Sequence, residues 1–86
     1  MCGIIAVLLQ QGHVASELYE GLGILQHRGQ NDAGIVTCGP KGRFYQCKAN
    51  GMVRDVFEPH NLANLIGSMG VGHVRYPTAG SFAHAE

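Results

Sequence analysis

The sequence predicts an α+β fold in which antiparallel strands pack against helices, and three observations predict it. Residues 4–9 form a short apolar run rich in β-branched side chains, which is typical of a buried strand. Apolar residues then recur at helical spacing over residues 14–26. Residues 33–38 and 43–49 have strand-like composition and flank a loop, residues 39–42, whose glycine and proline content favours a β-hairpin.

The predicted helix should lay one apolar stripe on the sheet. Gly21 and Gly23 oppose this prediction, because each glycine lowers helix stability by about 1 kcal/mol relative to alanine. The stripe consists of Val14, Leu18, Leu22 and Leu25.

The second half of the chain predicts two further elements. Residues 57–65 should include a short helix that begins near Glu58 and Pro59, and residues 69–75 have the composition of another strand. Residues 76–86 are rich in small side chains and lack a period, so they are expected to form a mobile loop.

Composition excludes several classes of function. The chain has 86 residues, enough for one small domain, and its formal charge is zero with lysine and arginine scattered, which disfavours binding to nucleic acid or an anionic membrane. The apolar run near the start is too short to span a bilayer. Three cysteines without a Cys-x-x-Cys pair disfavour a disulfide framework or a structural zinc site, so we expect a reducing, cytoplasmic location.

Cys2 is the most informative residue, because only Met1 precedes it. After removal of Met1, Cys2 would carry both a thiol and a free α-amine. Free α-amines ordinarily titrate near pH ~7.7 to 8.0, far below a lysine amine, so such an amine can accept the thiol proton at neutral pH. Taken alone, Cys2 also fits a small buried residue at the start of a strand.

Three segments, the first of which begins with Cys2, resemble those of a known family. They are CGI at 2–4, HRGQ at 27–30 and HVRYPTAG at 73–80. With DAGI at 32–35, KANG at 48–51 and DVF at 55–57, the chain resembles the class II glutamine amidotransferases over essentially its whole length. It is most similar to the amidophosphoribosyltransferase family of bacteria and fungi.

The resemblance implies part of a four-layer αββα sandwich with antiparallel sheets, the N-terminal nucleophile hydrolase fold, incomplete in this chain. It implies that mature Cys2 attacks the side-chain amide of L-glutamine, forms a thioester and releases ammonia. A second domain, absent here, would use the ammonia and phosphoribosyl pyrophosphate to make phosphoribosylamine, the first step of purine synthesis. Magnesium is expected in that domain, and the complete protein is expected to be a homo-oligomer.

The resemblance also assigns substrate-binding residues. Arg75 is expected to hold the glutamine α-carboxylate, because a planar guanidinium binds both carboxylate oxygens. Thr78 is expected to contact the same end of the substrate, in a loop that closes over it. Arg28 and Gly29 line the pocket in the family, although Arg28 equally fits a cation at a helix C-terminus. Without the resemblance, Arg75 would be a surface residue at a strand end.

Other residues are expected to lie outside the chemistry. His27 and His73 are interpreted as structural, since the α-amine already supplies a base. Cys38 and Cys47 are expected to face each other across the hairpin as buried thiols. Asn50 with Gly51 does not correspond to the Asn-Gly pair that supplies oxyanion donors in the family.

The glycines at 70–72 do not complete a dinucleotide-binding motif. The oxyanion donors and the aspartate that holds the glutamine α-amino group are expected beyond residue 86. The 86-residue chain alone is therefore expected to show no meaningful glutaminase turnover.

Two alternatives remain open. The chain fits another class II amidotransferase, such as the glucosamine-6-phosphate or asparagine synthases, although YPTAG at 76–80 favours the purine enzyme. It also fits a noncatalytic interaction module or truncated remnant that pairs with full-length subunits through an open sheet, and retention of Met1 would support that interpretation.

Overall fold

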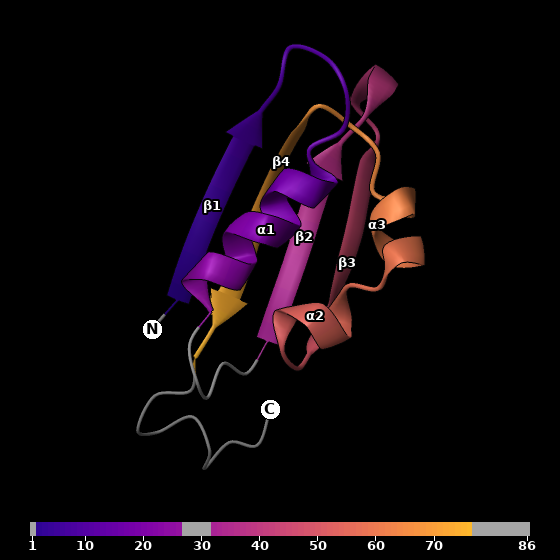
Figure 1. The fold of residues 1–86 in the computed structure, drawn as a ribbon. Coiled ribbons are helices and arrows are strands. Elements are labelled where there is room, and N and C mark those ends of the chain that lie inside the picture. Colours follow the sequence, from indigo (N-terminus) through magenta and orange to yellow (C-terminus); the bar gives the residue numbers. More distant parts are fainter. Residues whose placement is uncertain (1, 27–31, 77–86) are drawn as a thin grey trace.

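Four strands form one antiparallel sheet, and helices cover one of its faces (Figure 1). The computed structural model describes residues 2–26 and 32–76. The strand order is β1-β4-β2-β3, so β4, from the end of the described chain, lies between β1 and β2. The predicted α+β class with antiparallel strands is confirmed. The strands are β1 (Cys2–Leu8), β2 (Asp32–Cys38), β3 (Phe44–Asn50) and β4 (Met69–Arg75).

The core lies between the sheet and helix α1 (Ala15–Leu25). Val14, Leu18 and Leu22 from the predicted stripe are fully buried. They pack against alternate residues of the strands, and β4 has alternating burial along its length. The helical period and the strand period therefore meet at one apolar layer.

Two glycines of β4 let α1 approach the sheet closely. A Cβ atom on Gly70 would lie 2.8 Å from the carbonyl oxygen of Val36 and 2.9 Å from Leu18 Cδ1. A Cβ atom on Gly72 would lie 3.0 Å from Leu22 Cδ1. These glycines, which do not fit a nucleotide motif, therefore have a packing role.

The connections between strands hold two short elements that the sequence did not predict. The hairpin is confirmed, with a short 3₁₀ helix, η1 (Pro40–Gly42), between β2 and β3. Helix α2 (Val53–Val56) was not predicted; the backbone N–H of Val53 donates to Gln26 Oε1 at 3.2 Å, which ties α2 to the end of α1.

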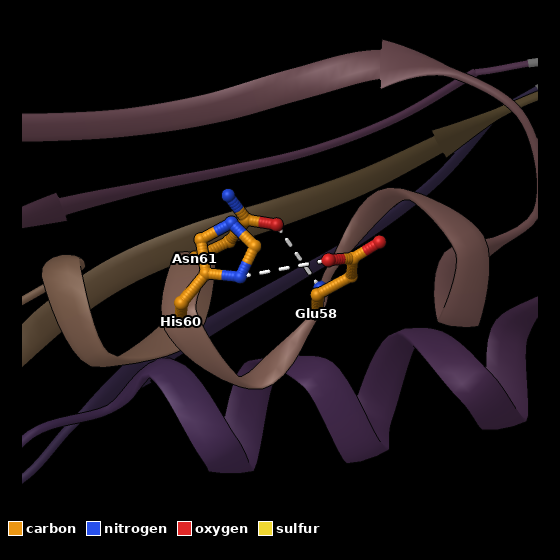
Figure 2. A network of polar contacts seen from close by, with 3 residues as sticks. All are labelled: Glu58, His60 and Asn61. Carbon is orange, nitrogen blue, oxygen red and sulfur yellow. Dashed lines mark hydrogen bonds and ion pairs between the residues drawn. The ribbon is translucent and has the colours of Figure 1, made fainter.

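Helix α3 (Pro59–Asn64) confirms the predicted short helix, and its N-terminus is capped by its own residues. Figure 2 shows the contact in which the backbone N–H of Glu58 donates to Asn61 Oδ1 at 3.1 Å. The Glu58 side chain in turn accepts from the backbone at Asn61, which completes a capping box. His60 lies 3.5 Å from Glu58 in an exposed pair, which adds little stability.

The predicted approach of Cys38 and Cys47 is wrong. Cys38 pairs with Phe44, whereas Cys47 pairs with Ile35. Because neighbouring residues along a strand alternate between faces, Cys47 lies on the helix-covered face and Cys38 on the other.

No helix among the described residues is long and apolar enough to cross a membrane.

Candidate active site

One row of paired residues crosses all four strands at the lower end of the sheet in Figure 1. The backbone of Cys2 pairs with Arg75, Arg75 pairs with Asp32 on its other side, and Asp32 pairs with Asn50. Residues directly opposite each other in antiparallel strands have Cα atoms about 4.5–5.5 Å apart. The sheet thus brings the expected nucleophile and the expected carboxylate-binding arginine to adjacent positions, although 73 positions separate them in the sequence numbering, from 2 to 75.

Arg75 forms an ion pair with Asp32 in this row. Arg75 Nη1 donates to Asp32 Oδ2 at 3.4 Å, and the two side chains are 43% and 22% exposed. Charge-assisted N–H to carboxylate bonds are commonly about 2.7–2.9 Å long, so this single contact is a loose one. A guanidinium group has further donors in its planar fork, so Arg75 can still bind a second carboxylate.

A surface hollow of about 390 Å³ lies over this end of the sheet, a volume within the range of small-molecule sites. Arg75 and Lys48 contribute positive charge and Asp32 negative charge. The hollow therefore suits a small ligand that carries a carboxylate. Its lining residues are Asp32, Ala33, Lys48, Ala49, Asn50, His73 and Arg75.

His73 lies in the hollow because its strand neighbour has no side chain. A Cβ atom on Gly34 would lie 2.5 Å from His73 Nε2 and 3.0 Å from Lys48 Cβ. Sequence reasoning interpreted His73 as structural and did not consider Asp32, Lys48 or Asn50 as lining residues. The alternation within residues 69–75 was the available signal, because it places His73 and Arg75 on one face.

The ends of the two segments that carry the remaining expected residues are tied together. The Tyr76 hydroxyl donates to the carbonyl oxygen of Leu25, which joins the end of β4 to the end of α1. Arg28, Gly29 and Thr78 follow these anchors and, like His27, lie outside the described residues. Their expected contacts with substrate stay predictions.

The helix-covered face has a different chemistry. Burial raises the pKa of the Cys47 thiol above its ordinary value, which favours the neutral form.

Among residues 2–26 and 32–76, no group of three or more histidine, cysteine and acidic side chains has the arrangement of a metal site.

Comparison with known proteins relates this geometry to a family. No protein-family profile matches the chain. The chain is 64% identical over 88 residues to an amidophosphoribosyltransferase of Schizosaccharomyces pombe, a match that covers 100% of this chain and 16% of the relative. Amidophosphoribosyltransferases of Saccharomyces cerevisiae and Escherichia coli are 58% and 49% identical to it, and each match covers 100% of this chain and 17% of the relative.

The chain is homologous to the N-terminal region of the amidophosphoribosyltransferases. It spans about one sixth of the length of these relatives.

Two solved structures show the same similarity at the level of the fold. The allosteric regulatory enzyme of purine biosynthesis superposes with a TM-score of 0.76 at 35% identity, over 93% of this chain and 17% of that one. The glutamine phosphoribosylpyrophosphate amidotransferase of Bacillus subtilis, solved with ADP and GMP, superposes with a TM-score of 0.78 at 32% identity, over 92% of this chain and 17% of that one.

Proposed function

We propose that this chain is the first part of a class II glutamine amidotransferase domain, in which Cys2 is the nucleophile that hydrolyses glutamine. The observation that carries the proposal is the pairing of Cys2 with Arg75 beside a hollow suited to a carboxylate. Similarity to amidophosphoribosyltransferases along the entire chain supports it.

The chemistry follows from the two groups of mature Cys2. Its α-amine accepts the thiol proton, and the thiolate attacks the side-chain amide carbon of glutamine. The α-ammonium group then returns the proton to the leaving nitrogen. The tetrahedral intermediate collapses, ammonia departs, and a thioester between Cys2 and the glutamyl group remains. Water then cleaves the thioester, so that glutamine and water give glutamate and ammonia.

Substrate orientation comes from the opposite end of the ligand. Arg75 binds the α-carboxylate through guanidinium donors that remain beside the Asp32 contact. As the family resemblance implies, Arg28, Gly29 and Thr78 complete the pocket. The same resemblance implies that the segment after Tyr76 closes over the bound substrate and excludes water.

In the parent protein we propose that ammonia passes to a phosphoribosyltransferase domain that uses magnesium and phosphoribosyl pyrophosphate to form phosphoribosylamine. The open face of the sheet would pack on a second sheet to complete the αββα sandwich. We place this parent protein in the cytoplasm as a homo-oligomer.

Intact-mass spectrometry of the full-length protein that carries this region tests the proposal. We expect loss of Met1 and addition of one electrophilic glutamine analogue, with the label abolished in Cys2→Ala. Cys38→Ala serves as the matched control and should retain the label. A labelled Cys2→Ala protein would contradict the proposed nucleophile.

A second candidate function, a noncatalytic interaction module, is favoured by one observation. Large apolar side chains are exposed on the face of the sheet opposite the helices, as is typical of a protein-binding surface. Retained Met1 in the mature protein would favour this function, because a blocked α-amine cannot act as the base.

A further inference from the structure

We propose that His13 is a pH-sensitive switch at the end of the sheet where Leu8 pairs with Met69, remote from the candidate active site. Near neutral pH it holds the α3–β4 connection, residues 65–68, against the β1–α1 connection, residues 9–14, and in acid it releases that segment. The observation behind the proposal is a hydrogen bond in which the backbone N–H of Gly67 donates to His13 Nδ1 at 2.8 Å. Figure 1 shows the two connections beside each other at this end of the sheet. The switch does not depend on the proposed glutaminase chemistry.

The bond between Gly67 and His13 requires a neutral imidazole. A backbone N–H can only donate, so Nδ1 must be the acceptor and the ring proton must lie on Nε2. A protonated imidazole donates from both nitrogens and cannot accept. Histidine changes its charge between about pH 5 and 8, so mild acidification removes the acceptor. The bond therefore stabilises the folded protein where the ring is neutral, and this stabilisation is lost as the pH falls.

The two partners of the bond differ in exposure. His13 is exposed, so its ring can take up a proton from solvent, whereas Gly67 is buried and its N–H has little access to water as a substitute acceptor. A buried donor that loses its acceptor destabilises the fold by more than an average hydrogen bond contributes. Protonation would also place a positive charge directly before Val14, the N-cap of α1, where the helix dipole disfavours a cation.

Gly67 cannot turn toward another partner. Its φ of 129° is one that glycine adopts readily and other residues rarely do. A Cβ atom at this position would overlap the carbonyl oxygen of Cys38, so the Gly67 backbone packs directly against the end of β2. The segment is therefore fixed in the conformation that directs its N–H at His13.

The other hydrogen bonds of residues 66–68 do not titrate. The Gly67 carbonyl oxygen accepts from the backbone N–H of Val14 at 2.9 Å, and the Ser68 carbonyl oxygen accepts from that of Leu9 at 2.7 Å. The Thr37 hydroxyl donates to the carbonyl oxygen of Ile66 at 2.7 Å. Amide and hydroxyl groups keep their charge in mild acid, so the contact with His13 is the pH-dependent one of this set.

Neighbouring titratable groups do not account for the same response. His13 borders two surface hollows, and among their described lining residues Cys38 is the one other titratable side chain. Acidification adds no charge to a thiol. The charged or titratable groups on the surrounding elements are all exposed and lie outside both linings: Glu17 of α1, Lys41 of η1, and Glu58 and His60 at the start of α3.

Hydrogen–deuterium exchange of the full-length protein, followed by mass spectrometry of peptides that span residues 66–68, tests the switch. The measured quantity is the protection factor, which corrects for the intrinsic effect of pH on exchange. Between about pH 7.5 and about pH 5.5 we expect protection of this segment in wild type to fall roughly 5- to 10-fold, as the loss of one buried hydrogen bond predicts.

Three variants separate the switch from a general effect of acid. His13→Asn places an amide oxygen close to the position of Nδ1, so it keeps an acceptor that does not titrate, and its protection should stay high at both pH values. His13→Ala lacks the acceptor, and its protection should be low at both. His60→Asn, at an exposed histidine of α3, is the matched control and should respond to pH as wild type does.

Wild-type protection that is equal at the two pH values overturns the proposal. So does a fall in His13→Asn as large as that in wild type, because the fall would then not require a titrating ring. If His13→Ala does not fold, the comparison of wild type with His13→Asn still decides. The release of glutamate from glutamine is tested separately with Cys2→Ala, so failure of the switch leaves the proposed function standing.

Discussion

The Arg75 guanidinium is the residue on which substrate orientation depends. It lies between Cys2 and Asp32 in the paired row and is 43% exposed, so a ligand in the hollow can reach it. Arginine presents a planar fork of donors to a carboxylate, whereas lysine presents a point charge. The geometry of the side chain matters here as well as its charge.

Replacement of Arg75 by lysine should therefore weaken glutamine binding. We expect KM for glutamine in the full-length protein to rise roughly 10- to 100-fold, as one or two charge-assisted hydrogen bonds are lost, with a smaller change in kcat. Arg54→Lys, at an exposed position of α2, is the control. Steady-state kinetics that give equal KM values for wild type and Arg75→Lys would exclude Arg75 from substrate binding.

The Cys47 thiol makes stability depend on pH. Because burial raises its folded-state pKa above the ordinary value of 9.0, its contribution is fully present below that pH. It is lost as the pH rises through 9 toward the folded-state pKa, since the unfolded chain releases the proton first. The free energy of unfolding should fall more steeply from pH 8 to pH 10 in wild type than in Cys47→Ala, as measured by urea titration of the chain. Parallel pH profiles would show that burial of Cys47 is not linked to folding.

At the scale of elements, local sequence pattern and composition predicted most of the fold. The long helix follows from apolar spacing, the strand at the N-terminus from a continuous apolar run, and the hairpin and the last strand from composition and turn residues. Helix α2 has only four residues, which is too few to show a helical period. Its first residue, Val53, is held by a hydrogen bond from its backbone N–H to the side chain of Gln26, which is distant in sequence. The faces of Cys38 and Cys47 depend on hairpin register, which composition alone does not specify.

The candidate site was predictable only in part for the same reason. Cys2 and Arg75 were found from chemistry and resemblance, but the Asp32 contact arises from pairing between β2 and β4, which are distant in sequence. His73 reaches the hollow because Gly34 leaves space for it. Neither relation is written in local sequence.

Close packing of α1 on β4 predicts opposite effects for two glycine substitutions. In Gly70→Ala the new methyl group would press against the Val36 carbonyl oxygen and Leu18, which should destabilise the chain by about 1–3 kcal/mol. Gly23→Ala has nothing within 4 Å and should stabilise α1 by up to about 1 kcal/mol. Urea unfolding of both variants measures this, and a Gly70→Ala chain as stable as wild type would refute the packing role.

At the scale of the whole molecule, the helices leave one face of the sheet open (Figure 1). Cross-strand pairing places large apolar residues together on that face. Soluble proteins rarely leave a group of large apolar side chains exposed in this way. These residues, with their exposed fractions, are Ile4 at 69%, Leu8 at 75%, Phe44 at 71%, Met69 at 48% and Val71 at 45%. Such a face is expected to be covered in the complete protein.

The 86-residue chain by itself should therefore self-associate through this face. Sedimentation velocity should show oligomers for wild type and a shift toward monomer for the double variant Leu8→Gln and Phe44→Gln. Ile24→Gln is the matched control, because Ile24 is 80% exposed but lies on α1, away from the open face. Equal association of the double variant and the control would exclude the open face as the contact surface.

The proposed role of Cys2 is tested most directly by the activity of the full-length protein with Cys2→Ala. We predict that this variant forms phosphoribosylamine from free ammonia at a rate close to that of wild type but does not release glutamate from glutamine. Glutamate release at the wild-type rate would contradict the account.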